Sequence, residues 1–194
     1  MKEVKQHRKT NETDIRLTLD LGIKAVPEIS TGLPFFDHLL YAMAFHGGFY
    51  LSLQATGDID VDPHHLVEDT GIVLGSALKE MFVQSGGVAR YGYSAIPMDD
   101  ALSEVVIDVC NRSYLVYDLT FPQNRSGDFD MWLLKEFFQG LVNNASINVH
   151  CICRYGENSH HMAESLFKAL GKALAQSYAP VSKDSSQMST KGVL

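Results

Sequence analysis

Cysteine is scarce in this chain, and its cysteines do not have the spacing of a metal or redox site. Cys110, Cys151 and Cys153 are the three cysteines of a 194-residue sequence, and they lie in apolar, strand-like segments without a CxxC pair. This pattern argues against a cysteine-rich zinc site and predicts buried, free thiols. We therefore expect a reducing compartment and a cytoplasmic protein.

Long apolar runs are missing as well. No stretch approaches the roughly 18 consecutive apolar residues of a membrane span, and the amino terminus MKEVKQHRKTNET lacks the apolar core of a signal peptide. Basic residues are in the minority, with 16 Lys and Arg against 23 Asp and Glu and a net charge of −7. Such a chain is not expected to bind nucleic acid or a membrane surface. Any anionic ligand must be held by a local group of basic side chains.

Two histidine-rich stretches stand out from this background. DPHHLVEDTGIVLGSAL and GENSHHMAESLFKALGKAL each contain adjacent histidines, a glutamate three residues after the second histidine, and a glycine ten residues after it. The recurring residues are His64, His65 and Glu68 in the first copy and His160, His161 and Glu164 in the second. The copies are 96 residues apart, half the chain, which indicates an internal duplication. We call each copy an HHxxE cassette.

The spacing within each cassette suits metal binding. In an α-helix, positions i and i+4 lie on one face, so the first histidine and the glutamate point the same way. The second histidine is rotated by about 100°, so the two rings favour two different ions over a shared one. Imidazole with carboxylate suits manganese, iron, cobalt, zinc or nickel. A surface His–Glu pair would explain one cassette equally well, but two matching cassettes favour metal binding.

Apolar periodicity and breaker residues divide each half into strands, helix, strand and helix. The first half has expected strands within 3–20 and at 49–56, and expected helices at 35–47 and 64–84. The second half has expected strands near 90–92 and at 102–112, 113–121 and 146–154, and expected helices at 130–145 and 158–178. This order predicts an α+β fold of two similar halves, 1–90 and 91–179, each a β-sheet with helices packed on one face. The polar tail, 180–194, is expected to be flexible.

Five motifs, in the same order along the chain, resemble the imidazoleglycerol-phosphate dehydratase family of histidine biosynthesis. They are FFDHLL followed by HG, GDIDVDPHHLVEDTG, PMDDALSEVVIDV, GENSHHMAESLFKAL and STKGVL, with RKTNET near the start. The resemblance implies a duplicated α+β fold and the dehydration of D-erythro-imidazole glycerol phosphate to imidazole acetol phosphate. It also implies two manganese ions (Mn2+) per active site, which stabilise an imidazolate. The implied assembly is a homo-oligomer of 24 subunits built from trimers, with active sites between subunits.

The same resemblance assigns the metal ligands. They are His38, His64, His65, Glu68, Glu136, His160, His161 and Glu164. Glu136, in KEFFQ, stands where the family often has histidine, and a carboxylate can also bind manganese. Glu136 precedes its cassette by 24 residues, much as His38 precedes its own by 26.

Catalytic and substrate-binding positions follow from the resemblance in the same way. Glu12 matches the family's catalytic glutamate and is expected to transfer a proton at the leaving hydroxyl. Asp99 matches an active-site position whose role is left open. The expected substrate- and phosphate-binding residues are Glu12, His46, Arg90, Arg112, Lys168, Ser189 and Lys191. With the last two, the tail is expected to close over bound phosphate.

Each of these positions also has an ordinary structural explanation. Glu12 alone would be an exposed strand carboxylate, and His46 before Gly-Gly would be a helix C-cap. Lys168 is placed for an i,i+4 salt bridge on its helix. The chain also departs from the family pattern at two places: Asp100 stands where glutamate is common, and CNR at 110–112 replaces the usual SGR.

Two other functions fit the cassettes. A binuclear metallohydrolase acting on a phosphate ester would also use paired ions, although such sites usually rely on bridging aspartates and each cassette has a lone glutamate. A metal-binding assembly protein would use its ions only to join subunits. It would need neither Glu12 nor a basic phosphate site.

Overall fold

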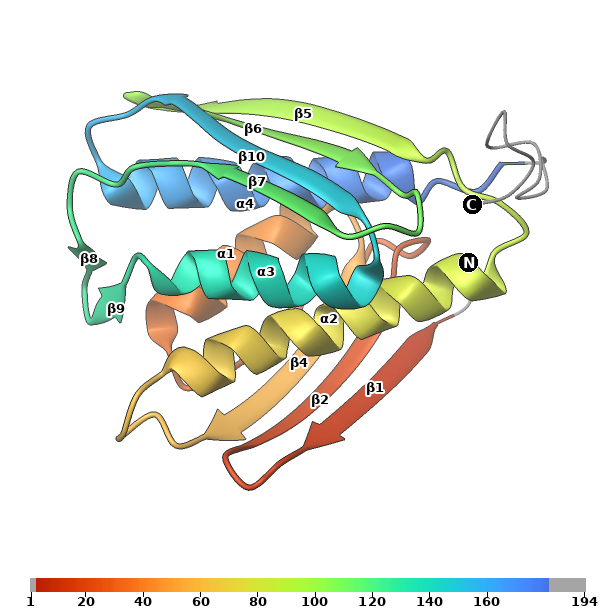
Figure 1. Ribbon diagram of the computed structural model, residues 1–194, viewed down its shortest axis with the longest axis horizontal. Helices are drawn as coiled ribbons and strands as arrows, with labels where there is room; N and C mark the ends of the chain where they lie inside the picture. Colours follow the sequence, from red (N-terminus) through yellow and green to blue (C-terminus); the bar gives the residue numbers. More distant parts are fainter. Residues whose placement is uncertain (1–2, 182–194) are drawn as a thin grey trace.

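The computed structural model describes residues 3–181, in which two four-stranded sheets lie on the outside and four helices lie between them (Figure 1). The first half consists of β1 (Val4–Lys9), β2 (Thr13–Asp20), β3 (Glu28–Ser30), α1 (Pro34–Gly47), β4 (Tyr50–Gly57) and α2 (His64–Gln84). The second half consists of β5 (Tyr91–Met98), β6 (Ala101–Asp108), β7 (Tyr114–Asp118), β8 (Arg125–Ser126), β9 (Phe129–Asp130), α3 (Leu133–Ala145), β10 (Asn148–Tyr155) and α4 (Ser159–Ser177). No helix between residues 3 and 181 combines the length and apolar character that a bilayer span requires.

The two large sheets have the same topology. Their strand orders are β1-β2-β4-β3 and β5-β6-β10-β7, and in each sheet the last strand runs parallel to its neighbour while the other pairs are antiparallel. Alternate residues on β2, namely Ile15, Leu17 and Leu19, are buried and form the helix-facing side of the first sheet. The predicted α+β class and the predicted pair of similar halves are confirmed.

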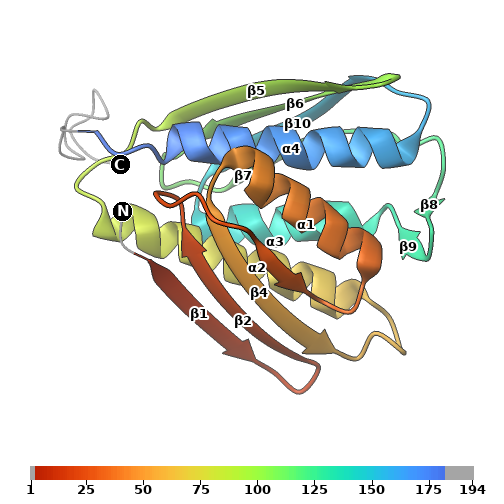
Figure 2. The same ribbon diagram turned by 180° about the vertical axis from the view of Figure 1, so that it is seen from behind.

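The cassette helix of each half packs against the first helix of the other half, α2 against α3 and α4 against α1. Figure 2 shows α1 lying across α4. Glycines let these backbones touch, because a Cβ added at Gly71 would lie 2.2 Å from the carbonyl oxygen of Phe137. A Cβ added at Gly171 would lie 1.9 Å from that of Met43. Any side chain at either position would push the halves apart.

Aromatic side chains fill the space between the halves. Phe36 of α1, Phe137 of α3 and Phe167 of α4 are fully buried. The ring centroids of Phe36 and Phe137 are 5.5 Å apart, and those of Phe137 and Phe167 are 5.4 Å apart, which is the range of favourable aromatic pairs. A single hydrophobic cluster runs through both halves. Each half therefore stabilises the helices of the other.

Three short strands, β3, β8 and β9, were not predicted from the sequence. Because Phe129 and Asp130 belong to the β8–β9 hairpin, α3 begins at Leu133 and not at residue 130. β6 and β7 end at Asp108 and Asp118, a few residues earlier than predicted. Strands of two or three residues have too little alternation to be recognised from sequence.

The close crossing of α2 and α3 gives a first prediction. Gly71→Ala should lower the free energy of unfolding by about 1–3 kcal/mol, because the added methyl group meets a backbone carbonyl that cannot rotate away. Gly86→Ala is the matched control, since a Cβ there meets nothing within 4 Å. It should change stability by at most about 0.5 kcal/mol. Urea unfolding of both variants measures the difference in stability. Equal urea midpoints would contradict the close crossing of α2 and α3.

Candidate metal centre and active site

All four helices begin at the same end of the molecule, on the left in Figure 1. The predicted ligands lie in their first two turns, with His38 in α1, Glu136 in α3 and the three residues of a cassette in each of α2 and α4. A helix N-terminus is electropositive, so carboxylates are stabilised at this end of the fold. The predicted metal ligands therefore gather where acidic groups are best tolerated.

His38, His160 and Glu164 form a compact group of ligand atoms, which we call the His38 group. Glu164 Oε2 lies 3.0 Å from His38 Nε2 and 3.2 Å from His160 Nε2. One ligand atom of each residue lies within 4.8 Å of the other two. His38 comes from α1 and the other two from α4, so the group exists because helices of different halves pack together. Two imidazole nitrogens and a carboxylate oxygen at one point can hold a divalent metal ion.

Glu164 is the buried member of the His38 group, with 8% of its surface exposed. Burial alone raises the pKa of the Glu164 carboxyl, but hydrogen bonds from Lys168 and His38 outweigh it and lower that pKa to about 2. Lys168 Nζ lies 2.7 Å from Glu164 Oε1. The carboxylate is thus ionised at neutral pH. Lys168 makes the helical salt bridge that its spacing allows, and its contact with phosphate stays a prediction.

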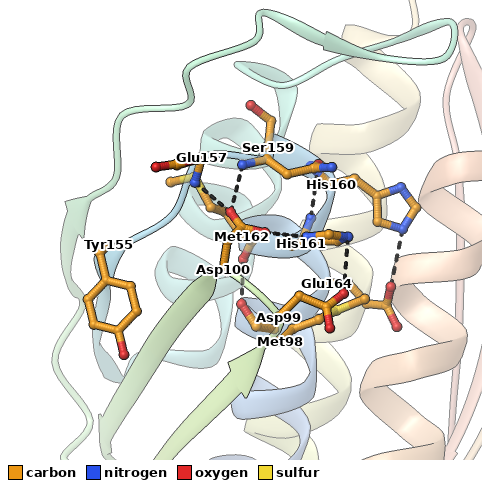
Figure 3. A network of polar contacts seen from close by, with 12 residues as sticks. Met98, Asp99, Asp100, Tyr155, Glu157, Ser159, His160, His161, Met162 and Glu164 are labelled. Carbon is orange, nitrogen blue, oxygen red and sulfur yellow. Dashed lines mark hydrogen bonds and ion pairs between the residues drawn. The ribbon is translucent and has the colours of Figure 1, made fainter.

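In the second cassette, an aspartate holds the ring of the second histidine. Asp100 Oδ1 lies 2.5 Å from His161 Nδ1 (Figure 3). His161, and after it the backbone N–H groups of Glu157 and Asn158, hold the pKa of Asp100 well below its usual range. Because Asp100 occupies Nδ1, Nε2 is the nitrogen through which the ring could bind a metal ion.

In the first cassette, Asp58 has the same role. Asp58 Oδ2 lies 3.1 Å from His65 Nδ1 and raises the pKa of the His65 ring. Asp58 follows directly after β4 and precedes His65 by seven residues. It was not among the predicted site residues. The acidic sequence GDID just before the cassette is the signal that could have found it.

Glu12 and Asp99, the two predicted catalytic carboxylates, lie in equivalent hairpins. Glu12 is in the turn between β1 and β2, and Asp99 is in the turn between β5 and β6. Glu12 Oε2 lies 3.7 Å from His65 Nδ1, and Asp99 Oδ2 lies 3.5 Å from His161 Nε2. Each carboxylate is exposed and stands beside the second histidine of its own half.

The predicted ligands of the first cassette are less compact. His64 Nε2 lies 3.6 Å from Glu68 Oε2, and the His64 ring packs against Trp132 with 5.4 Å between centroids. Glu136 is half-buried and lies one turn after Trp132 on α3. Within the described part of the chain, only the His38 group brings three such ligand atoms within 4.8 Å of one another.

The two arginines predicted to bind phosphate lie at the opposite end of the fold. The N–H of Arg90 donates to the carbonyl of Ser177 at the end of α4, about 20 Å along that helix from Glu164. The Arg90 guanidinium lies 2.7 Å from Asp108. Arg112 follows β6 at the same end, where β10 begins. A single chain therefore does not bring either arginine to the His38 group.

His46 lies in the last turn of α1, close to the basic residues of α4. Partial burial and the positive charges of Lys168 and Lys172 lower the pKa of His46. A neutral imidazole beside two ammonium groups is compatible with the predicted substrate contact, which stays a prediction. Ser189 and Lys191 lie outside the described residues.

A pocket of about 510 Å³ opens beside the His38 group. It is lined by Leu33, Pro34, Phe35, His38, Ser126, Gly127, Asp128, Phe129 and His160. The β8–β9 hairpin forms one wall, and no motif in the sequence marked that hairpin. A larger hollow of about 880 Å³, between Met81 and Pro180, contains none of the predicted ligands. The predicted ligands and this larger hollow are thus in different places.

Comparison with known proteins decides the family. The family model for imidazoleglycerol-phosphate dehydratase matches residues 31–174. The chain belongs to the imidazoleglycerol-phosphate dehydratase family. Relatives of that name include the proteins of Geobacter sulfurreducens, 46% identical over 96% of both chains, and Acidithiobacillus ferrooxidans, 44% identical over 100% of this chain and 98% of the relative.

Solved structures of imidazoleglycerol-phosphate dehydratases have the same fold. The Staphylococcus aureus enzyme is 33% identical, with a TM-score of 0.84 over 93% of this chain and 100% of that one. The Pyrococcus furiosus enzyme, solved in complex with (S)-C348, is 38% identical, with a TM-score of 0.85 over 97% of this chain and 100% of that one. As an imidazoleglycerol-phosphate dehydratase, the chain is a hydro-lyase of histidine biosynthesis. The alternative of a phosphate-ester hydrolase is therefore wrong.

The lowered pKa of Glu164 gives a pH-dependent prediction. Because folding lowers this pKa from 4.5 to about 2, the stabilisation is present above pH 4.5 and is lost as the pH falls towards 2. In EDTA-treated protein, Glu164→Gln should lower the free energy of unfolding by about 2 kcal/mol at pH 7, and by less than half of that at pH 3.

Urea midpoints at pH 7, 5 and 3, at one protein concentration, measure this difference. Glu157→Gln, an exposed carboxylate just before α4, is the control and should change stability by at most about 0.5 kcal/mol at each pH. A deficit of Glu164→Gln that stays constant from pH 7 to pH 3 would mean that the charge of Glu164 does not stabilise the fold.

Proposed function

We propose that this chain dehydrates imidazole glycerol phosphate at a site with two manganese ions. The observation that carries the proposal is the His38 group, in which two imidazole nitrogens and an ionised carboxylate converge from different halves. Manganese accepts both kinds of donor. When bound, the two ions would act as Lewis acids that stabilise the imidazolate form of the substrate ring, so that the hydroxyl on the adjacent carbon can leave.

The duplication supplies a second set of ligands. α2 packs on α3 as α4 packs on α1. By this equivalence, Glu136, His64 and Glu68 correspond to His38, His160 and Glu164. The second histidines of the cassettes would complete the two sets through Nε2, since an aspartate occupies Nδ1 of each ring. Each second histidine points about 100° away from its own cassette's ligands, so we infer that it serves an ion held by a neighbouring subunit.

The position of the arginines supports an active site between subunits. Arg90 and Arg112 lie at the end of the fold away from the His38 group, so they would reach the substrate of another chain. We propose the assembly that the family resemblance implies, a homo-oligomer of 24 subunits built from trimers. We also propose that it works in the cytoplasm, where Cys110, Cys151 and Cys153, free in the structure, would stay reduced.

Proton transfer is assigned to Glu12. Its carboxyl group is exposed and lies beside the His65 ring, where it could give a proton to the hydroxyl that leaves as water and then, as the carboxylate, take the proton that the neighbouring substrate carbon loses. Asp99, in the equivalent hairpin, is the second candidate for proton transfer. Charge-assisted hydrogen bonds would hold the phosphate. The residues proposed for this are Arg90, Arg112, Lys168, Ser189 and Lys191, with His46 at the substrate and the tail closing over it.

Removal of the metal tests the proposal directly. EDTA-treated protein should lose dehydratase activity and fall to smaller oligomers, and Mn2+ should restore both. His38→Ala should keep kcat at least about a hundredfold below wild type even with excess Mn2+, since it removes a ligand of the His38 group. His7→Ala, on an exposed strand position beside Asp14, is the control and should be unaffected. Reassembly by Mn2+ without any activity would favour ions that only join subunits.

The role of Glu12 has its own test. Glu12→Gln should lower kcat by about 10²-fold or more, because a positioned acid or base contributes that much to a rate. Its manganese content and particle size should match wild type, since Glu12 is not a proposed ligand. Asp14→Asn, on the next strand and paired with His7, serves as the control. A wild-type kcat in Glu12→Gln would exclude Glu12 as the proton-transfer group.

A further inference from the structure

We propose that Asp69 is a positioning residue for Glu12, an inference that rests on the role proposed for Glu12. Asp69 follows the predicted ligand Glu68 on α2, but it is buried, with 7% of its surface exposed, while Glu68 is half-exposed. Instead of facing the metal site, the Asp69 side chain contacts the hairpin between β1 and β2. That hairpin carries Glu12.

Both oxygens of the Asp69 carboxylate are bound by residues of the hairpin strands. Oδ2 accepts a hydrogen bond from the Thr13 hydroxyl at 2.5 Å, and Oδ1 accepts one from Arg8 Nε at 3.0 Å. Thr13 is also buried, with 4% of its surface exposed. Hydrogen bonds to a charged acceptor are about twice as strong as neutral ones and gain further from burial. The base of the hairpin is therefore tied to α2 on both strands.

The charge on Asp69 also sets the direction of the hydroxyl groups in the turn. A carboxylate can only accept, so Thr13 donates to Asp69 and its Oγ1 is left to accept from Thr10, 3.2 Å away. Thr10 Oγ1 then accepts from the backbone N–H groups of Glu12 and Thr13, at 3.1 and 2.9 Å. Two hydroxyls thus connect Asp69 to the backbone of Glu12.

The carbonyl group of Glu12 is bound to Asp58, the residue that holds the His65 ring. The Glu12 carbonyl accepts a hydrogen bond from the N–H of Asp58 at 3.2 Å, and the Asp58 side chain holds His65 Nδ1. If the turn loosens, the Glu12 carboxylate moves relative to this ring. Proton transfer is sensitive to such movement, because misplacing a reacting group by about 1 Å can lower a rate about a hundredfold.

The second half has no carboxylate at the position of its cassette helix that corresponds to Asp69. The residue 96 positions after Asp69 is Ser165, whose hydroxyl donates to Ser103 Oγ at 2.8 Å, a neutral contact. The hairpin of that half is held by Asp100 instead, which accepts from the backbone of the segment before α4. The second hairpin is therefore fastened by a half-buried carboxylate of its own turn, whereas the Glu12 hairpin is tied to a buried carboxylate on the cassette helix.

The test is a double-mutant cycle on kcat. Asp69→Asn should lower kcat about tenfold with little change in KM or manganese content, and Glu12→Gln should lower it about a hundredfold or more. If Asp69 acts through Glu12, the double variant should have the kcat of Glu12→Gln within about twofold. Hydrogen exchange should rise in the peptide that contains residues 8–17 of Asp69→Asn.

Two further comparisons separate positioning from loss of stability. Thr13→Val removes the hydroxyl that binds Asp69 and should lower kcat as Asp69→Asn does, whereas Thr13→Ser should retain most of the rate. Glu104→Gln is the matched control, because Glu104 is also buried, at 6% exposure, and is bound by Arg154 through two hydrogen bonds at 2.8 and 3.0 Å. It should destabilise the fold comparably without lowering kcat.

Each outcome decides the proposal. If kcat is low in Glu12→Gln and a further tenfold lower in the double variant, the positioning role of Asp69 is overturned. The assignment of proton transfer to Glu12 then stands. A wild-type kcat in Glu12→Gln would overturn both the assignment of proton transfer to Glu12 and the positioning role. If Asp69→Asn does not fold, Thr13→Val and its cycle with Glu12→Gln give the same comparison. Equal kcat values for Thr13→Val and Thr13→Ser would also overturn the proposal.

Discussion

The contact between α1 and α4 is the constraint on which the candidate site depends. His38 meets His160 and Glu164 only because the first helix of one half lies against the cassette helix of the other. That contact in turn requires Gly171, where the backbone of α1 leaves no room for a side chain. The buried aromatic cluster between the halves holds the crossing in place. The chemistry of the site is thus a consequence of how the two halves pack.

Aspartates form a second layer behind the predicted functional groups. Asp58 and Asp100 hold the Nδ1 atoms of the two second histidines, and Asp69 holds the hairpin of Glu12. Asp69, the buried one, accepts hydrogen bonds from two side chains, so the cost of keeping its carboxylate away from water is offset locally. This layer limits the rotation of the groups in front of it. A site built on such supports needs less rearrangement when a ligand binds.

Features with a regular spacing could be predicted from the sequence, whereas contacts between distant segments are known only from the structure. The cassettes were recognisable because the i,i+4 spacing and the 96-residue repeat can be read directly from the sequence. Periodicity shows which residues share a face of one helix, but not which helix lies opposite, so the pairing of His38 with Glu164 could not be derived. Asp69 has no signal of its own, because its partners are 56 and 61 residues away. The distant position of Arg90 likewise depends on tertiary structure alone.

The exchange of helices between halves also has a consequence for the history of the fold. A chain with only one half would carry a cassette helix but no opposite first helix, so it could complete a ligand group only by pairing with a second identical copy across a twofold axis. A twofold axis relates two copies of the same sequence. When two copies are joined in one chain, their sequences no longer have to be identical. Glu136 could then replace the counterpart of His38, and Ser165 the counterpart of Asp69. Gene fusion thus allows two originally identical ligand groups to become different. The contact between helices that forms each group is kept.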